Sequence, residues 1–282
     1  MQVNPIQPDF AAEVHGLPGP EGMDAVVARE LRQIWLRYGV VLLRDLAMNP
    51  DDLVRFSAFF GELEPPPASE AGTREELGGQ PVWYISNVRE NGQAIGSLGN
   101  AQAEWHTDMS YLEEPPTASI LFAQEVPDSG GNTSFADMEA ALDALDDNLR
   151  EVIGDRMVHH DSSTTSVGET RRGHDAVFDV TTAPGASHPA IRTHPETGRA
   201  SLYLGRRLHA WVEGMDVAES EALLDRLWEH CARPEFSWEH VWRAGDLVMW
   251  DNRRMIHRRD AFDPTIRRIM LRTQLRGDRP YR

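Results

Sequence analysis

Two segments near the C-terminus, GDLVMWDNRRMIHRRD at residues 245–260 and TIRRIMLRTQLRG at residues 265–277, predict a β-hairpin. Both contain short runs of apolar and β-branched residues, and the Asp263-Pro264 pair between them is typical of a turn. In a hairpin, the strand that ends near His257 folds back beside the strand that carries Arg268. The two segments therefore bring a histidine and an arginine into one neighbourhood.

The last strand, taken as 265–276, has two different faces because successive side chains point to opposite sides. One face is aliphatic and typical of packing, whereas the other carries Arg268, Arg272 and Gln274. If the polar face points into a small barrel, its guanidinium groups need anions, and ligand carboxylates are the simplest ones. The alternative is an exposed strand in an arginine-rich tail that pairs with surface carboxylates, and the sequence leaves both possibilities open.

The rest of the chain continues the pattern of short strands with a few flanking helices. Strands are expected at 40–43, 82–88 and 117–123, and helices at 24–38, 49–60, 137–149 and 216–232. This arrangement predicts a mainly β fold on a β-barrel or jelly roll. We find no internal repeat and no linker, so we expect one domain over residues 1–282. Two polar stretches rich in Gly and Pro, 65–80 and 162–189, are expected to be covering loops.

Composition limits the partners. The chain has 282 residues, 40% of them hydrophobic, and a net charge of -17. Such an acidic surface argues against nucleic acid and anionic membranes, which need basic contacts. Residues 1–20 contain no apolar signal core, and no run is long enough to span a membrane. We therefore expect a soluble, cytoplasmic protein whose partner is a small molecule or another protein.

The cysteine and lysine counts exclude several chemistries. The single cysteine, Cys231, rules out an internal disulfide or a multi-cysteine metal site and favours a reducing compartment. All 28 basic residues are Arg, so neither a Schiff-base lysine nor the lysine of a P-loop is present. A helix residue buried in the core is the expected role of Cys231.

A candidate metal motif lies in EWHTDMSYLEEPP, residues 104–116. His106 and Asp108 are two positions apart, so in an extended strand they point the same way and can bind one ion. A His-x-Asp triplet arises about once by chance in a chain of this composition, so the spacing needs support. Similar pairs occur at His159 and Asp161, and at His194 with Glu196.

Support comes from the distant histidine in the predicted hairpin. His106, Asp108 and His257 together give two histidines and one carboxylate, the set that binds non-haem Fe(II) on one face. Such a set leaves positions open on the ion. A bidentate co-substrate and dioxygen can occupy those positions together.

With these residues in place, the sequence resembles the TauD/TfdA family of Fe(II)- and 2-oxoglutarate-dependent dioxygenases. The motifs that carry the resemblance cover nearly the whole chain: GVVLLRD (39–45), FSAFFGEL (56–63), WHTDMSY (105–111), PDSGGNTSFADM (127–138), HPETGR (194–199), LYLGRR (202–207), AGDLVMWDNRRMIHR (244–258) and RRIMLR (267–272). The resemblance implies a double-stranded β-helix core, which is a jelly roll of the cupin-like kind.

The resemblance also implies roles for single residues. His106, Asp108 and His257 would bind Fe(II), while Thr133 and Arg268 would bind the distal carboxylate of 2-oxoglutarate. Arg272 would lie near the other end of the co-substrate or near an anionic group of the substrate. The implied reaction consumes O2, releases succinate and CO2, and hydroxylates an unactivated C–H bond of a small anionic organic substrate. Because the carboxylate ligand is present, hydroxylation is favoured over halogenation.

Four residues that flank the metal motif are candidates for the substrate pocket, namely Tyr84, Asn87, Gln102 and Tyr111. For each, ordinary packing or a surface hydrogen bond is an equally good interpretation. FGEL is followed by Glu64 and three prolines, where taurine dioxygenase-like sequences have a histidine that binds the sulfonate. Taurine is therefore doubtful, and a carboxylate substrate or one with a polar or cationic group facing Glu64 is an equally good candidate.

Two alternatives remain from the sequence. One is a metal enzyme of the same fold that does not use 2-oxoglutarate, such as a cupin-like isomerase or dioxygenase, and the other is a non-catalytic small-molecule binding protein. The Thr133 and Arg268 pair favours the 2-oxoglutarate enzyme, because the alternatives need no second anchor for a dicarboxylate. A homo-oligomer, either a dimer or a tetramer, is expected.

Overall fold

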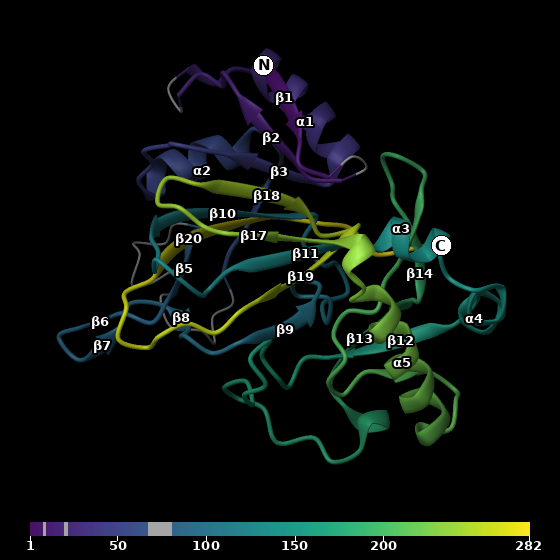
Figure 1. Cartoon of the computed structure of the whole chain (residues 1–282). Coiled ribbons are helices and arrows are strands. Elements are labelled where there is room, and N and C mark those ends of the chain that lie inside the picture. Colours follow the sequence, from purple (N-terminus) through teal and green to yellow (C-terminus); the bar gives the residue numbers. More distant parts are fainter. Residues whose placement is uncertain (8–9, 20–21, 67–80) are drawn as a thin grey trace.

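The computed structural model describes residues 1–7, 10–19, 22–66 and 81–282 (Figure 1). The covering loop expected at 65–80 therefore falls almost entirely outside the described residues. The described part is rich in β-strands, with a few helices.

Two sheets lie face to face in the upper and middle part of the view in Figure 1. The larger sheet has the strand order β1 (Gln2–Pro5), β2 (Ala12–His15), β3 (Val40–Leu43), β18 (Leu247–Asp251), β10 (Ala118–Glu125), β20 (Ile269–Leu275), β5 (Trp83–Ser86) and β8 (Ser97–Leu98), and β4 (Leu63–Glu64) also pairs with β20. The smaller sheet has the order β17 (Ser237–His240), β11 (Thr133–Asp137), β19 (Met255–Arg259) and β9 (Ala103–His106). The β-hairpin expected from residues 245–260 and 265–277 is therefore wrong, because β19 and β20 pair in different sheets. His257 and Arg268 still lie in one neighbourhood, since both line a cavity between the facing sheets.

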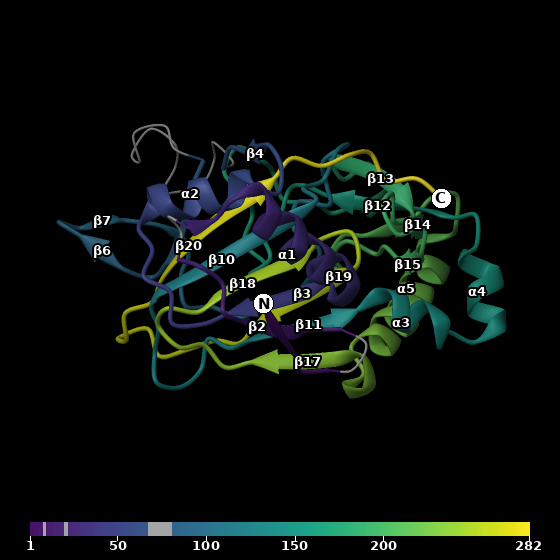
Figure 2. The same cartoon turned by 90° about the horizontal axis from the view of Figure 1, so that it is seen from above.

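Helices α1 (Ala25–Tyr38) and α2 (Pro50–Ala58) cover the outer face of the larger sheet (Figure 2). Each begins where the sequence supplies a cap. The Asp24 side chain accepts hydrogen bonds from the first free amides of α1, and Asn49 forms a reciprocal capping box with Asp52 at α2. The predicted helices at 24–38 and 49–60 are thus confirmed within one or two residues.

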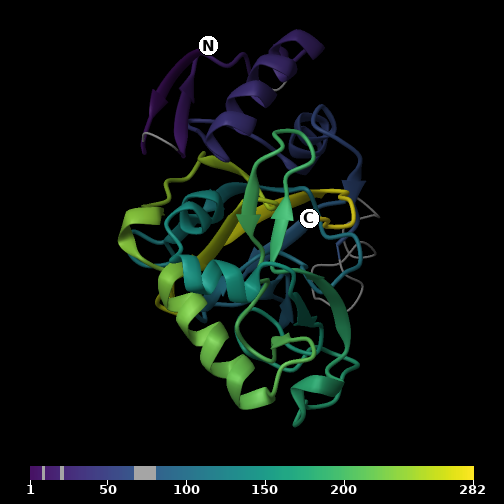
Figure 3. The ribbon, with the colours of Figure 1, turned by 90° about the vertical axis from the view of Figure 1, so that its right-hand side faces the viewer.

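A lateral region of helices and short strands packs around its own apolar cluster beside the sheets (Figure 3). It contains α3 (Met138–Asp143), α4 (Asp147–Ile153), α5 (Val217–Cys231), β12 (Met157–Asp161), β13 (Gly185–Pro189), β14 (Ile191–Thr193), β15 (Ala200–Leu202) and β16 (Trp211–Val212). Cys231 is buried in this cluster, and burial raises the pKa of its thiol. The short hairpin β6 (Arg89–Glu90) and β7 (Gln93–Ala94) lies at the opposite end.

Two sequence expectations for this region were wrong in detail. The single helix expected at 137–149 is broken, because Asp146 caps a new helix by accepting from the Leu149 amide. The loop expected at 162–189 ends in strand β13, which pairs with β12, and contains a short 3-10 helix at Val180–Thr182. Its remaining residues are irregular, as expected.

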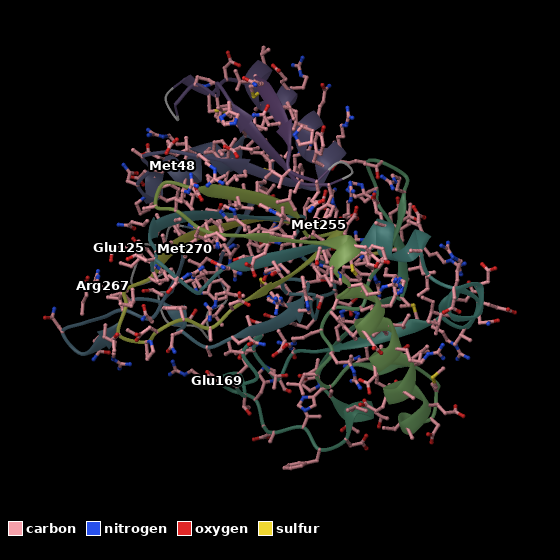
Figure 4. The ribbon with its side chains drawn as sticks, viewed as in Figure 1. Met48, Glu125, Glu169, Met255, Arg267 and Met270 are labelled. Carbon is pink, nitrogen blue, oxygen red and sulfur yellow. The ribbon has the colours of Figure 1, made fainter. Side chains whose placement is uncertain are left out.

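Strand β20 shows why the two arginine interpretations could be separated only by the structure. Arg268, just before the strand, and Arg272 within it are buried, whereas Leu271 and Leu275 pack toward α1 and α2 on the other face. The polar face therefore points into the space between the sheets. Pairing with a surface carboxylate applies instead to Arg267, whose Nε lies 2.7 Å from Glu125 at the rim of the molecule (Figure 4).

A shared apolar cluster fills much of the space between the sheets. Phe135 of β11 packs against Trp250 of β18 with ring centroids 5.4 Å apart, and Met255 and Met270 belong to the same cluster (Figure 4). Near β9, β5 and β8 the side chains between the sheets become polar, and the candidate site lies there. No helix of the described chain combines the length and apolar character needed to cross a membrane.

Candidate metal centre and dicarboxylate pocket

The three predicted metal ligands meet between the sheets. His106 of β9 and His257 of β19 are cross-strand partners, and Asp108 follows two residues after His106. The Asp108 Oδ1 atom lies 3.6 Å from His106 Nε2 and 3.8 Å from His257 Nε2. Within the described part of the chain, this is the group of three ligand side chains whose donor atoms all lie within 4.8 Å of one another, and all three are buried.

Neighbouring groups fix the orientation of these ligands. His106 Nδ1 lies 2.7 Å from the Glu104 carbonyl, so that nitrogen donates and Nε2 keeps its lone pair for an ion. Ser119 Oγ donates to Asp108 Oδ2 at 2.7 Å, which leaves Oδ1 facing the histidines. The Asn252 side chain holds the Asp108 backbone by accepting from its amide and donating to its carbonyl.

The electrostatics favour the protonation states that bind a metal. Burial alone would raise the pKa of Asp108, but the groups that face it, the Arg272 guanidinium first among them, hold that pKa well below its usual range. Burial, together with the nearby His106, lowers the pKa of His257 to about 3. A carboxylate and a neutral imidazole are the forms that coordinate an ion, so the donor set fits Fe(II).

Arg272 joins the metal ligands to the larger sheet. Its Nη1 lies 3.2 Å and 3.3 Å from the two oxygens of Asp108, and its guanidinium carbon lies 4.0 Å from the centre of the Trp83 ring. A guanidinium over an indole is held in one orientation. Sequence reasoning found Arg272 but missed Trp83.

A cavity beside the triad of His106, Asp108 and His257 contains the predicted co-substrate anchors. Thr133 and Arg268 line it, together with Arg259, Arg272 and both triad histidines. Thr133 Oγ1 accepts from Trp242 Nε1 at 2.9 Å, so the threonine proton is free to be donated to a ligand.

Arg268 has little in the protein to offset its charge. Its Nη2 is 3.5 Å from the Gly131 carbonyl, and its Nε has no hydrogen-bond partner. Burial, with the neighbouring Arg259 guanidinium, lowers the pKa of Arg268 to about 9. Burial likewise lowers the pKa of Arg259 to about 10. A cavity with two such cations and a free hydroxyl proton suits a carboxylate.

A further cavity at the metal ligands is also lined by cationic side chains. His106 and Asp108 share a cavity with Tyr111, Arg171 and Arg206. Arg171 stacks on Tyr111 at 4.6 Å, and Arg206 donates to the Asp161 carbonyl at 2.8 Å. Thr165 and Ser166 also line this cavity, so the 162–189 segment lies at the site.

Of the four candidate pocket residues, the structure brings Tyr111 alone to this cavity. Tyr84 faces the helix side of the larger sheet, because it is one position out of step with Trp83. Asn87 donates to the carbonyls of Pro264 and Ile266 and accepts from the Arg268 amide, so it fixes the turn before β20.

The two remaining polar candidates are engaged at the surface. Gln102 donates to Glu104 at 2.8 Å and is exposed. Glu64, proposed to face a polar group of the substrate, pairs with Arg276 at 3.4 Å. Neither residue lines the cavities at the triad.

The other two His-x-acid pairs, His159 with Asp161 and His194 with Glu196, do not converge on one ion, and their histidines bond other parts of the protein. His194 Nε2 lies 3.0 Å from Asp251 Oδ2, and its Nδ1 accepts from the amides of Glu196 and Thr197. His159 Nδ1 lies 3.1 Å from Ser187 Oγ. Neither histidine belongs to the metal cluster, so the choice of His106 among the His-x-acid pairs agrees with the geometry.

A larger cavity of about 750 Å³ lies on the other side of β9. Trp105, whose side chain alternates with that of His106, forms part of its wall, and Thr165, Ser166 and Arg206 line both this cavity and the cavity at the triad. The triad itself does not line it.

Comparisons with known proteins agree with this geometry. The family model described as "Taurine catabolism dioxygenase TauD, TfdA family" matches residues 2–274. An (S)-phenoxypropionate/alpha-ketoglutarate-dioxygenase of Sphingobium herbicidovorans is 31% identical, over 98% of this chain and 95% of its own length. An alpha-ketoglutarate-dependent 2,4-dichlorophenoxyacetate dioxygenase of Cupriavidus pinatubonensis is 32% identical, over 98% and 97%.

A solved structure is similar over the same length. The crystal structure of AAD-2 in complex with Mn(II) and N-oxalylglycine superposes with a TM-score of 0.80 at 32% identity, covering 99% of this chain and 98% of that one. The two chains are therefore similar in fold over nearly their entire lengths.

Proposed function

The chain belongs to the TauD, TfdA family and is a 2-oxoglutarate-dependent dioxygenase, and from this premise we propose which of its residues perform the reaction. His106, Asp108 and His257 bind Fe(II), and Thr133 and Arg268 bind the distal carboxylate of 2-oxoglutarate. The observation that supports this assignment most directly is the position of a buried two-histidine, one-carboxylate cluster beside a cavity lined by Thr133 and Arg268.

The enzyme uses Fe(II), 2-oxoglutarate and O2. The chemistry that the iron supplies when bound is activation of O2, which turns 2-oxoglutarate into succinate and CO2 and delivers one oxygen atom to a substrate C–H bond as hydroxyl. The chain supplies ligands, orientation and exclusion of water. Ser119 and Asn252 hold Asp108 in place, the Glu104 carbonyl sets the His106 tautomer, and the Thr133 hydroxyl donates a hydrogen bond to the co-substrate.

We propose a small organic anion as the substrate. Arg171, Arg206 and Arg272 line the cavity that contains Tyr111, where Asp108 is the acidic side chain among the described lining residues. The related dioxygenases from Sphingobium and Cupriavidus are named for phenoxypropionate and 2,4-dichlorophenoxyacetate, both of which are carboxylates. Arg272, which lines both cavities, is placed to bind the anionic group of the substrate or the carboxylate next to the keto group.

We also propose the type of core, the location, the assembly and the partners of the enzyme. The two facing sheets form a double-stranded β-helix, or jelly-roll, core within one domain. The enzyme is cytoplasmic, a location that suits its single buried thiol, and it forms a homo-oligomer. Its partners do not include nucleic acid, because the net charge is -17. Light scattering coupled to gel filtration measures the oligomeric state.

The assignment is tested by adding Fe(II) and then 2-oxoglutarate to the protein without oxygen and recording the visible charge-transfer band of a chelated keto acid. We expect the band in the wild-type protein and in His159→Ala, and no band in His257→Ala, because one histidine ligand is then missing. Iron binding without a band in the wild-type protein would refute the use of 2-oxoglutarate, and a normal band in His257→Ala would refute the ligand set.

A further inference from the structure

Arg259 lies in the co-substrate cavity, although no sequence motif singled it out. It follows His257 by two positions on β19, so both side chains lie on the same face of the strand. Its cross-strand partner on β11 is Thr133. Arg259 lines the same cavity as Thr133 and Arg268 and is only 7% exposed.

The polar contacts of Arg259 in the protein are one-sided. Its Nη2 donates to the carbonyl of Leu98 at 2.8 Å and to the carbonyl of Ala101, whereas Nε has no hydrogen-bond partner. Among the described residues, neither Arg259 nor Arg268 forms an ion pair with a carboxylate. The preceding residue on the strand differs in this respect, since half-buried Arg258 lies 3.7 Å from the Asp260 carboxylate.

Two buried cations that share one cavity are unfavourable unless an anion joins them. Each has lost its water, and each repels the other. A carboxylate between them removes both costs, and the Thr133 hydroxyl adds a neutral donor on the same side. If the carboxylate bound Arg268 alone, the Arg259 guanidinium would stay buried without a counter-ion.

We propose that Arg259 is a second guanidinium anchor for the distal carboxylate of 2-oxoglutarate and makes the cavity selective for keto acids with a negatively charged tail. This inference rests on the proposed function, which assigns only Thr133 and Arg268 to that carboxylate. Arg259 binds the charged tail, while the metal bound by His106, Asp108 and His257 binds the keto-acid end that all 2-oxo acids share.

Arg259 also holds a wall between the two cavities, and this second role has to be separated from the first. Leu98 has a φ of 65°, a left-handed conformation that is unusual for leucine, and Arg259 bonds its carbonyl. Leu98 lines both the co-substrate cavity and the cavity that contains Tyr111. If Arg259 acted only by holding Leu98 in place, its loss would weaken the binding of every keto acid, whatever the charge of the tail.

The test compares two keto acids that share one end. 2-Oxoglutarate and 2-oxopentanoate are titrated without oxygen into the Fe(II) protein, and the dissociation constants are read from the charge-transfer band. In Arg259→Gln we expect at least tenfold weaker binding of 2-oxoglutarate and a change within twofold for 2-oxopentanoate. Arg259→Lys, which keeps the charge, should recover part of the loss, and the matched control Arg258→Gln should change neither constant.

Each other outcome counts against the inference. Equal weakening of both keto acids means that Arg259 acts only through the wall at Leu98, and unchanged binding of 2-oxoglutarate means that it does not contact the co-substrate. Iron stoichiometry, measured on the same samples, shows that the variants are folded around an intact triad. If the wild-type protein binds neither keto acid, the proposed function fails as well, which distinguishes that result from failure of the Arg259 assignment alone.

Discussion

Four arginines between residues 253 and 268 are buried, and they fall into two pairs with opposite surroundings. Arg253 lies 2.7 Å from Asp251 and 2.8 Å from Glu196, and Arg254 lies 2.6 Å from Asp137. Arg259 and Arg268 are equally buried but have no carboxylate partner among the described residues. The first pair packs where β18 and β19 meet the lateral region, and the second faces the cavity beside the triad.

This difference separates arginines that hold the fold from arginines that hold a ligand. Arg253 belongs to a network in which Glu196 also contacts Arg32 of α1, so the tip of the β14–β15 hairpin is tied to the N-terminal helix (Figure 3). Its charge is balanced when the chain folds. The charge of Arg268 is balanced only when an anion arrives, so the two pairs should respond to substitution in opposite ways.

Arg253→Ala should give the largest loss of stability. It leaves Asp251 buried without its guanidinium, and breaking such a pair costs roughly 3–5 kcal/mol in the free energy of unfolding. Urea unfolding measures the effect, and Arg267→Ala, which breaks the exposed pair with Glu125, is the control and should cost less than about 1 kcal/mol. A loss as small as that of the control would contradict the structural role of the Arg253 pair.

Arg268→Ala should show the reverse pattern. We expect binding of 2-oxoglutarate to weaken by about 100-fold, or about 2.7 kcal/mol, because the carboxylate loses a buried charged partner. The unfolding free energy of the ligand-free chain should hardly fall, since an uncompensated charge is removed. A charge-transfer titration and urea unfolding measure the two quantities, and a stability loss equal to that of Arg253→Ala would erase the distinction between the pairs.

His194→Ala tests the Asp251 network with a smaller expected loss of stability than Arg253→Ala. The substitution removes the histidine that donates to Asp251 and should lower the unfolding free energy by roughly 1–3 kcal/mol. Iron stoichiometry, measured by metal analysis, should stay at the wild-type value because His194 lies outside the metal cluster. Loss of iron would mean that the wrong histidine pair was chosen.

The pH dependence of stability gives the smallest expected difference. Burial would raise the pKa of Asp251, but Arg253 and His194 outweigh it and hold that pKa far below its usual range. A depressed pKa in the folded state stabilises the protein above the unfolded pKa of about 3.9, and that stability is lost as the pH falls below it. Asp251→Asn should therefore be less stable at neutral pH and decline less steeply below about pH 4 than the wild-type chain. Parallel pH curves in urea unfolding would count against this assignment.

The sequence was sufficient to predict which side chains lie together wherever they alternate strictly along a strand. Alternation in the last strand placed Arg268 and Arg272 on one face, and the i, i+2 spacing placed His106 with Asp108. The same rule applied to β19 would have found Arg259 from His257, so that residue was detectable. What alternation could not decide was which face of the last strand meets the cavity, because that depends on α1 and α2 covering the other side.

The misses arose where a local choice depends on a partner elsewhere in the chain. From the sequence we predict Tyr84 and not Trp83 as a pocket residue. Which of the two faces the cavity depends on the pairing of β5 with β20, which places Trp83 opposite Arg272. Asn87 resembles a pocket residue in sequence, yet its amide bonds the turn before β20, a segment nearly 180 positions away. Ser119 lies outside the motifs, and Asn252 lies within AGDLVMWDNRRMIHR without a role that the sequence could assign. Both became visible only through their contacts with Asp108.

The strict alternation along β20 has a consequence for redesign. Arg268, Met270, Arg272 and Gln274 face the space between the sheets, whereas Leu271, Thr273 and Leu275 face the helix side, so the two sets of side chains can be varied independently. A library confined to Trp83, which lies under Arg272, would change the shape of the cavity at Tyr111 while the Arg272 contact with Asp108 and the leucines that pack against α1 and α2 remain in place. In evolutionary terms, new specificities could arise at this strand through single substitutions that leave the hydrophobic packing intact.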